Sequence, residues 1–406
     1  MYLDFAWRYF KAKKSANAIN IIARVTTCVI AFATCCQILV LSVFNGFEGL
    51  VKSLYSSFYT DIKIVPSTGK TFLLNADQLS KINKQPYVQQ SSLIAEENAL
   101  LKNDEHQSSL TLKGVDENFS KVSGLPNKVT RGKFNIGNVD EPSIVIGSGV
   151  QYQANITVND AFAPEELTVI LPKKNITSND PLQSLSEGNV TATGVFMIQQ
   201  EFDNTYAITN IDFVKQQLKL AEDEFTSVEI KLKAGADIKD CKESLQLLLG
   251  KNYIVQTRFE QNTNLYNTMI IEKWAIYAVL TLILVIAAFN MVSALTMLVL
   301  EKKQDIAILQ SMGTTRQQIK KIFLTEGILL GGLGTVCGIS LAMIICFLQV
   351  KFKLIPLNGG SFLIDYFPVK FIATDFLLVA STAMAISLIA SWFPAFKASR
   401  QPLELR

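Results

Sequence analysis

The side chains that most often carry chemistry are sparse in this sequence, and they form no recognisable site. His106 is the only histidine among the 406 residues, and Cys241 is the only cysteine between positions 47 and 274. This scarcity argues against a zinc cage of histidine and cysteine ligands and against a Ser-His-Asp triad. The aspartates and glutamates are scattered, and no spacing singles out a catalytic pair. We therefore expect no catalytic residue and no metal site.

One short motif could bind phosphate, but it is incomplete. Gly69-Lys70-Thr71 matches the end of a phosphate-binding loop, whose pattern requires another glycine five positions before Gly69. Ile64 occupies that position. We expect the chain to lack an ATPase site and to bind no cofactor, so that it is not an enzyme on its own.

The strongest local pattern lies between residues 301 and 315. It begins with charged residues, continues with Ile306, Leu309 and Met312, and ends at Gly313 followed by two threonines. The spacing predicts a short helix whose apolar residues enter a groove on another protein. The alternative is a simple connection between two apolar segments, which would need fewer residues.

Four stretches without a charged residue determine the class of the protein. About 20 residues suffice to cross a hydrocarbon core as a helix, and these stretches have 21 to 27 residues. We therefore predict four membrane spans. The first is too long for the apolar region of a signal peptide and is followed by no cleavage site, so we interpret it as an uncleaved anchor. The stretches are Val25–Phe47, Trp274–Leu300, Gly327–Val350 and Phe376–Phe396.

The net charge of +3 is divided unevenly along the chain. Residues 47–268 contain 21 basic and 27 acidic side chains, whereas the remainder contains 17 and 8. Twelve basic residues lie in the N-terminal segment, in the loop after the second span and in the C-terminal tail, against three in the loop before the fourth span. Because basic loops face the cytoplasm, we expect both termini there and the acidic segment outside.

The ionisable residues near the spans give no indication of ion transport, and the small residues of the third span indicate helix packing. Arg24 and Glu326 each precede a charge-free stretch by one position, as residues at helix ends do. Since no charge lies inside a stretch, the sequence argues against an ion-coupled carrier. Four glycines of the third span share one helix face and allow close approach of another helix, from this chain or a second one: Gly327, Gly331, Gly334 and Gly338.

The acidic segment after the first span predicts a large domain of helices and strands. An apolar stripe from Phe44 to Phe58 extends the first span outward as a stalk. A strand–helix–strand pattern occurs near each end of the domain, over residues 61–93 and 227–257, and indicates an α/β layer built from both ends. The middle has short apolar runs between turn residues, which indicates a β-rich insertion.

The expected fold is an α-helical membrane protein with four spans in the order 1 + 3 and a large α+β domain inserted between the first two. Its expected segments are an interfacial helix (1–18), the first span and stalk (19–60), the domain (61–258, with an α/β layer at 61–115 and 225–258 and the insertion at 116–224), a second stalk and span (259–300), the loop helix (301–321), the third span (322–350), an external loop (351–371), the fourth span (372–396) and a tail (397–406).

Several motifs resemble those of one transporter superfamily. The loop 301–315 and the following Arg316–Glu326 resemble the coupling helix region of FtsX/MacB-type ABC permeases. Leu41–Glu48, with the sequence LSVFNGFE, is similar to the end of the first span in lipoprotein-releasing (LolC/LolE-type) permeases. The resemblance extends over almost the whole chain and is weakest at 116–224. Further matches are Leu112–Asp116, Thr193–Phe196, Ala288–Asn290 and Trp392–Ala398.

The resemblance implies a role and a set of partners. It implies a multi-pass subunit of the bacterial inner membrane with a periplasmic domain, paired with a second permease subunit and with cytoplasmic ATPase subunits that bind ATP and Mg²⁺. Its substrates would be lipoproteins passed to a periplasmic carrier. The implied ATPase contacts are Glu301, Lys302, Asp305, Ile306, Leu309, Met312 and Gly313, and the implied substrate cavity is lined by Val40, Val43, Phe44, Phe47, Ile283, Ile286 and Asn290.

One departure and two alternatives remain at this point. In one class of subunit, a hairpin rich in proline and apolar residues binds the carrier, but residues 172–189 here are polar and contain lysines. The sequence therefore leaves open whether the pair is LolC-like, LolE-like or homodimeric. An FtsX-like signalling scaffold that regulates cell-wall hydrolases would have a much smaller external region. A MacB-like efflux permease would carry a fused ATPase domain.

Overall fold

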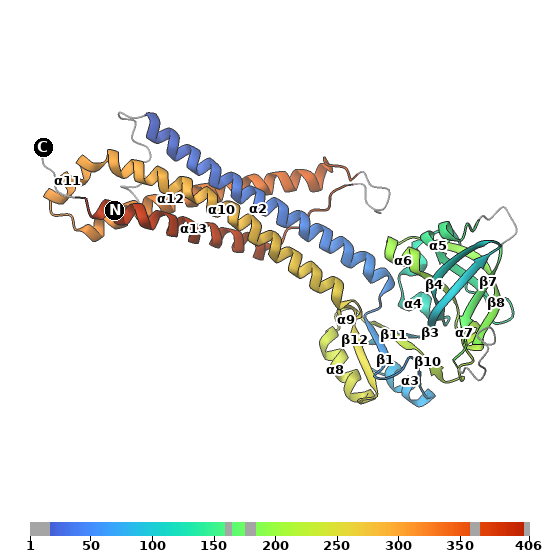
Figure 1. The fold of residues 1–406 in the computed structure, drawn as a ribbon. Coiled ribbons are helices and arrows are strands. Elements are labelled where there is room, and N and C mark those ends of the chain that lie inside the picture. The colour runs from blue at the N-terminus through green and yellow to red at the C-terminus, as the bar shows by residue number, and fades with distance from the viewer. Residues whose placement is uncertain (1–16, 159–164, 175–183, 358–365, 402–406) are drawn as a thin grey trace. The chain divides into compact units, whose positions relative to one another are not determined.

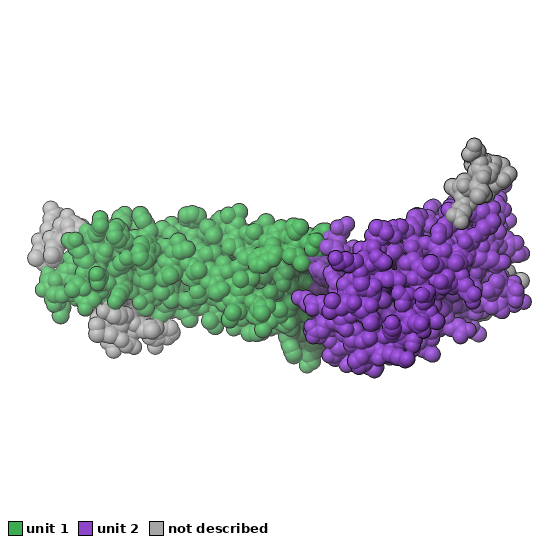
Figure 2. Space-filling view, turned by 90° about the horizontal axis from the view of Figure 1, so that it is seen from below, with its two compact units in different colours: residues 1–50, 267–358, 364–406 green, residues 51–266, 359–363 purple. Residues whose placement is uncertain are grey.

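The computed structural model describes residues 17–158, 165–174, 184–357 and 366–401, and the chain forms two compact units (Figures 1 and 2). Of the described residues, unit 1 comprises 17–50, 267–357 and 366–401, and unit 2 comprises 51–158, 165–174 and 184–266. The expected interfacial helix at residues 1–18 lies outside the described residues except for its last two positions.

Four long helices dominate the membrane part of the chain. Each is long and apolar enough to cross a membrane, and a helix of 42 residues such as α2 is about 63 Å long at 1.5 Å per residue. They coincide in order with the four charge-free stretches, so four spans in the order 1 + 3 are confirmed. The helices are α2 (Asn17–Phe58), α10 (Thr263–Glu301), α12 (Arg316–Phe352) and α13 (Ala373–Ser399), with the short α11 (Lys303–Ser311) before α12.

The helices continue beyond the charge-free stretches at several ends. The helix α2 runs without a break through the apolar stripe to Phe58, and α10 begins at Thr263, eleven residues before the charge-free stretch that starts at Trp274. Residues 316–321 were expected in the loop, but they form the first turns of α12 because Thr315 and Gln318 make a capping box. The third helix therefore begins six residues earlier than expected.

Unit 2 is built around one sheet of ten strands in the described residues. Its strand order is β12-β1-β11-β3-β4-β9-β6-β8-β5, with β7 paired to both β3 and β8, and β10 and β2 form a separate pair. The strands are β1 (Ile62–Pro66), β2 (Phe72–Leu73), β3 (Val88–Asn103), β4 (His106–Val115), β5 (Val129–Gly132), β6 (Ser143–Gly147), β7 (Glu166–Pro172), β8 (Leu185–Phe196), β9 (Tyr206–Asn210), β10 (Glu224–Phe225), β11 (Ser227–Leu232) and β12 (Tyr253–Thr257).

Short helices cover this sheet and connect its strands (Figure 1). Some of them contribute side chains such as Ile82, Val150 and Leu245 to a core that includes Ile64, Leu112 and Val228. The short helices are α3 (Ala76–Asn83), α4 (Phe119–Val122), the 3₁₀ turn η1 (Leu125–Lys128), α5 (Ser148–Gln153), α6 (Gln200–Thr205), α7 (Ile211–Leu218), α8 (Ile238–Leu249) and α9 (Arg258–Gln261).

The two ends of the domain interleave in the sheet. Strand β1 from the first end lies between β11 and β12 from the second, with Ile62 opposite Ile230 and Thr257. The middle segment at 116–224, expected as a β-rich insertion, contributes β5 to β9, which extend this same sheet through the pairing of β9 with β4 and of β7 with β3. One hydrophobic core therefore serves both segments, since residues of both belong to it.

The end of α2 is held in unit 2 by aromatic contacts and a buried ion pair. The ring of Phe58 stacks on Phe202 with centroids 4.5 Å apart. Lys113 Nζ lies 4.9 Å from the Phe58 ring centroid and 2.6 Å from a carboxylate oxygen of Glu229. Because both charged side chains are almost fully buried, removing either one would leave an unpaired charge in the core.

A buried carboxyl makes the stability of unit 2 depend on pH. Asp203 accepts hydrogen bonds from the Ile198 amide at 2.9 Å and the Ser148 hydroxyl at 3.3 Å, yet burial raises its pKa from 3.8 to about 6. The folded state therefore binds this proton more tightly than the unfolded state does. The stabilisation is present below the unfolded pKa and is lost as the pH rises to about 6.

We predict that Asp203→Asn weakens this pH dependence. Between about pH 5 and about pH 8 the parent should lose roughly 1 kcal/mol of stability through this group, and the variant should not, because asparagine stays neutral. Melting curves of the full chain in detergent would measure the difference. An equal pH dependence in parent and variant would contradict the assignment to Asp203.

Candidate functional site between three spans

A cluster of polar side chains joins three of the long helices in unit 1. Lys273 Nζ of α10 lies 3.0 and 3.2 Å from the two carboxylate oxygens of Asp375 on α13. It also donates to Asn45 Oδ1 of α2 at 3.0 Å, and Asn45 Nδ2 donates to Asp375 Oδ2 at 2.7 Å. We call these residues the Asn45–Lys273–Asp375 cluster. Its charges are mutually neutralised, which lets them persist in partly buried positions.

Local structure explains why these residue types occupy these positions. Asp375 lies in the first turn of α13, where a negative charge is stabilised by the helix dipole. Asn45 must donate to a carboxylate and accept from an ammonium at the same time, and an amide side chain does both. Neither aspartate nor leucine could replace it in this role.

The residues around Asn45 fasten the following loop to α2. The Lys370 amide donates to the Ser42 carbonyl at 3.0 Å, and the rings of Phe47 and Phe367 meet edge to face at 5.8 Å. A Cβ atom at Gly46 would lie 2.1 Å from the Pro368 carbonyl oxygen. The motif Leu41–Glu48 is therefore a packing surface for residues 367–370 as well as part of a span.

We predict that Gly46→Ala destabilises this end of unit 1. The added methyl group overlaps the Pro368 backbone, which must shift to make room for it, at a cost of roughly 1–3 kcal/mol. Gly49→Ala is the matched control, since the nearest atom to a Cβ there is a flexible lysine carbon at 3.7 Å. Melting temperatures in detergent should fall for Gly46→Ala and stay near the parent for Gly49→Ala. Equal melting temperatures would contradict the close contact.

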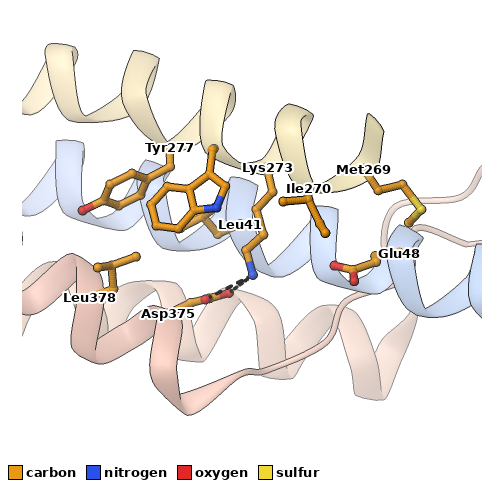
Figure 3. A pocket seen from close by; sticks show the side chains of 9 residues that line it. Leu41, Glu48, Met269, Ile270, Lys273, Tyr277, Asp375 and Leu378 are labelled. Atoms are coloured by element: carbon orange, nitrogen blue, oxygen red, sulfur yellow. Dashed lines mark hydrogen bonds and ion pairs between the residues drawn. The ribbon is translucent and has the colours of Figure 1, made fainter. Parts of the chain in front are cut away.

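A pocket of about 280 Å³ lies beside the Asn45–Lys273–Asp375 cluster (Figure 3). Its wall is mostly apolar, and its polar part consists of the ion pair of Lys273 with Asp375 and of Glu48. Trp274 meets Tyr277 edge to face at 5.8 Å, and the Tyr277 hydroxyl lies 2.5 Å from that of Thr382. The lining residues are Leu41, Glu48, Met269, Ile270, Lys273, Trp274, Tyr277, Asp375 and Leu378.

The pocket suits an amphipathic ligand of limited size. Ligand sites usually measure about 300–1,000 Å³ and combine apolar walls with a few polar groups. At about 280 Å³, this pocket accommodates one end of a lipid chain or a head group. It is too small to enclose several acyl chains.

The cavity residues expected from the sequence lie elsewhere on α2 and α10. Val40, Ile283, Ile286 and Asn290 are exposed in the single chain, and Val43, Phe44 and Phe47 are half-buried. None of them lines the pocket described above. Three of these residues, Ile283, Ile286 and Asn290, follow one face of α10 at helical spacing. They remain candidates for a larger cavity completed by another molecule.

The sequence analysis did not single out Lys273 and Asp375 as candidate functional residues. Each lies one position before a charge-free stretch, the same position that drew attention to Arg24 and Glu326. Asn45 belonged to a noted motif but had no assigned role. The available signal was the pairing of opposite charges at matching ends of two spans.

The predicted loop helix exists as α11, but its apolar residues have different environments. Ile306 is only 2% exposed and packs in a cluster with Leu298, Ile319 and Phe323. Met312 is 78% exposed, and Ile308, which we had not singled out, is 57% exposed. The expectation that Ile306 projects toward a partner is therefore wrong for this structure, because that face of α11 packs on the chain itself.

The other residues expected at this contact lie at the ends of α11. Glu301 is exposed at the end of α10, Lys302 pairs with Asp305 at 3.1 Å, and Leu309 is half-buried. Gly313 has a φ of +91°, a backbone conformation that favours glycine. A larger residue there would strain the loop itself, independently of any partner.

The four glycines of α12 face two neighbouring helices of the same chain. A Cβ at Gly327 or Gly331 would lie 2.2 Å from side-chain atoms of Ser391 or Ser387 on α13. At Gly338 it would lie 2.4 Å from the Ala31 carbonyl of α2, and at Gly334 it would lie 2.9 Å from Ile30. The partner helices left open by the sequence are thus α13 and α2, and no second subunit is needed for this packing.

The described residues contain no group of three or more histidine, cysteine or carboxylate side chains that could hold a metal ion. His106 lies instead on a surface groove of unit 2. The polar chemistry that the described spans offer at the pocket is therefore ion pairing and hydrogen bonding beside an apolar wall.

The fold and the site define an integral membrane protein in which a large domain interrupts the helices after the first span. Residues 25–248 match the family model of the MacB-like periplasmic core domain, and residues 277–403 match that of the FtsX-like permease C-terminal region. The first match alone covers more than half of the chain. The chain belongs to this family of FtsX-like permeases with a MacB-like core domain, and its large domain is periplasmic.

Individual relatives narrow the comparison. The chain is 26% identical to the lipoprotein-releasing system transmembrane protein LolE of Haemophilus influenzae, covering 98% of this chain and 97% of the relative. It is 28% identical to LolC of Neisseria meningitidis serogroup B, covering 98% of both. The periplasmic region of MacB from Actinobacillus actinomycetemcomitans is 16% identical, with a TM-score of 0.36 over 54% of this chain and 98% of that one.

Proposed function

We propose that this chain is a permease subunit of an ATP-binding-cassette transporter. It extracts lipoproteins from the outer leaflet of the inner membrane and delivers them to a periplasmic carrier. The observation that carries the proposal is its similarity, over nearly its full length, to permeases named for lipoprotein release. The order of spans and domain agrees with the family models.

The chemistry of the substrate fits the surfaces of unit 1. Each buried acyl CH₂ group contributes about 0.8 kcal/mol, so several chains cannot pass through water without a large penalty. The exposed apolar face of α10 with Ile283 and Ile286 provides a path for chains, together with Val40 and Phe44 of α2. The pocket beside Lys273 takes a polar end or a single chain.

The proposed assembly includes three further kinds of protein. A cytoplasmic ATPase binds ATP and Mg²⁺ and contacts α11 through Ile308 and Met312, with both termini of this chain on the same side. A second permease subunit, identical or different, completes the cavity. A periplasmic carrier receives the lipoprotein. Strands β7 and β8 form a hairpin in which Pro172 pairs with Leu185. The family resemblance places carrier binding at this hairpin in one class of subunit. Residues 175–183 of the hairpin are outside the described part.

Depletion in the native host tests the proposal. We expect lipoproteins to accumulate in the inner membrane fraction, and expression of the intact chain from a plasmid should reverse the accumulation. Affinity purification of the intact chain should also recover an ATPase. Normal lipoprotein localisation after complete depletion would contradict the proposed function, and so would a defect confined to cell-wall cleavage.

A further inference from the structure

A polar groove in unit 2 lies beside the last strand of the sheet. It has a volume of about 810 Å³ and is lined by His106, Thr130, Arg131, Ser148, Gln151, Tyr152, Asn155, Ile156, Val195 and Met197. A second hollow of about 730 Å³ shares Thr130, Arg131, Gln151 and Ile156 with it. The shared residues make the two hollows one continuous groove, which we call the β5 groove.

The charge of the β5 groove is opposite to that of the domain around it. The described residues that line it include Arg131 and no aspartate or glutamate, whereas residues 47–268 carry six more acidic than basic side chains. Lys128 and Lys133 flank Arg131 on the same segment. Arg131 is exposed, and its guanidinium makes no hydrogen bond or ion pair to another described residue. An unpaired guanidinium in an acidic domain favours an anionic ligand.

The shape of the β5 groove favours an extended chain. Strand β5 is the last in the sheet order, and among the described strands it pairs only with β8. The groove runs from β5 across Val195 of β8 to α5, a span that a polypeptide segment can follow. Asn155 supplies an amide side chain along the groove. Ser148 and Gln151 donate to Asp203 and to the Ile156 carbonyl, respectively, and their oxygens can still accept hydrogen bonds from a peptide backbone.

Tyr152 and Met197 of the β5 groove can make apolar contacts with the side chains of a ligand. Tyr152 is 89% exposed, and Met197 is also exposed. Tyrosine and methionine are frequent at sites that bind polypeptides. A short anion such as phosphate would use Arg131 alone, but an acidic peptide uses Arg131 together with these apolar residues.

We propose that the β5 groove binds an extended, acidic segment of a partner polypeptide. Arg131 pairs with a carboxylate of that segment, Tyr152 and Met197 contact its apolar side chains, and its backbone lies along the groove between β5 and α5. The residues that line the groove do not include the paired ends of β7 and β8 at Pro172 and Leu185, and the proposal does not depend on lipoprotein release.

The test uses the full chain in detergent and fluorescein-labelled octapeptides in which acidic and apolar residues alternate. The acidic peptide should bind, as measured by fluorescence anisotropy, and a peptide with lysine at each acidic position should not. Arg131→Glu should raise the Kd at least about tenfold. Tyr152→Ala should raise it about fivefold, and added salt should weaken binding.

Control variants separate a specific site from a general effect of charge. Lys251→Glu makes the same charge change at an exposed position outside the β5 groove and should leave the Kd within about twofold of the parent. Arg131→Lys keeps the charge and should retain most of the affinity. Because Arg131 and Tyr152 are exposed, melting temperatures should be unchanged.

Four results would overturn the proposal. The first two are that the acidic peptide does not bind, or that the lysine peptide binds equally well. The third is that Arg131→Glu and Lys251→Glu lose the same affinity for the acidic peptide. The fourth is that an anionic polysaccharide at equal charge concentration displaces the acidic peptide completely. The last result would identify a general anion site in place of a peptide groove.

Discussion

Replacing Asp375 with leucine should abolish lipoprotein release and reduce the stability of unit 1. The substitution leaves the Lys273 ammonium without its carboxylate and frees the Asn45 amide that donates to it. Breaking a buried ion pair by removing one partner costs about 3–5 kcal/mol, and the Lys273–Asp375 pair is partly buried, so we expect about 3 kcal/mol. Fractionation of lipoproteins and melting curves in detergent measure the two effects.

A double substitution separates the structural and the functional role of this pair. Lys273→Met with Asp375→Leu removes both charges, and replacing a buried pair by apolar residues is often neutral for stability. We therefore expect the melting temperature to recover and release to stay low, because the pocket has lost its ion pair. Recovery of release in the double variant would show that the ion pair only holds the helices together.

An exposed ion pair provides the matched control for these substitutions. Lys70 and Glu97 of unit 2 lie 2.8 Å apart with Lys70 largely exposed, and such pairs contribute about 0–1 kcal/mol. Lys70→Met should change neither release nor melting temperature measurably. A large effect of Lys70→Met would mean that loss of any ion pair impairs this chain, and the assignment to Lys273 and Asp375 would fail.

The spans and the ends of the domain could be predicted because their signals are local. A charge-free stretch such as Trp274–Leu300 marks a span without reference to any other residue. The strand–helix–strand patterns at 61–93 and 227–257 are likewise short-range. The joining of both segments into one sheet depends on pairing across the chain, such as Ser227 with Ile94, and no local pattern specifies that register.

The Asn45–Lys273–Asp375 cluster shows why the site was harder to predict than the fold. Asn45 and Asp375 are 330 positions apart, so only the packing of α2 on α13 brings them together. Each charge alone looks like an ordinary residue at a helix end. Opposite charges at the ends of two spans could have suggested the pair, but the sequence does not state which spans are neighbours.

The helix α11 was predicted correctly as a helix, but the sequence could not show which of its faces is buried. The sequence placed Ile306, Leu309 and Met312 on one apolar stripe, and helical spacing alone cannot say what covers that stripe. Here Ile319 and Phe323 of α12 pack with Ile306, because the capping box at Thr315 starts α12 early. The apolar residues of this region that are exposed to a partner are therefore Ile308 and Met312, and not Ile306.

Aspartate at Ile308 or Met312 should uncouple the transporter from its ATPase while the chain stays folded. Both side chains are exposed, so a charge there costs little in the isolated chain, but it must be desolvated when the ATPase binds. We expect the affinity for the ATPase to fall at least about tenfold and lipoprotein release to stop. Copurification and ATPase activity of the reconstituted complex measure these effects.

Ile306→Asp should also impair lipoprotein release, but by destabilising the fold and not by weakening the contact with the ATPase. It places a charge in the cluster with Leu298 and Phe323, so we expect a lower melting temperature before any partner is added. Leu247→Asp, an equally large change at an exposed position of unit 2, should leave binding and melting unchanged. If Ile308→Asp and Met312→Asp bind the ATPase as the parent does, the partner does not use the exposed face of α11, and the coupling role assigned to this helix is wrong.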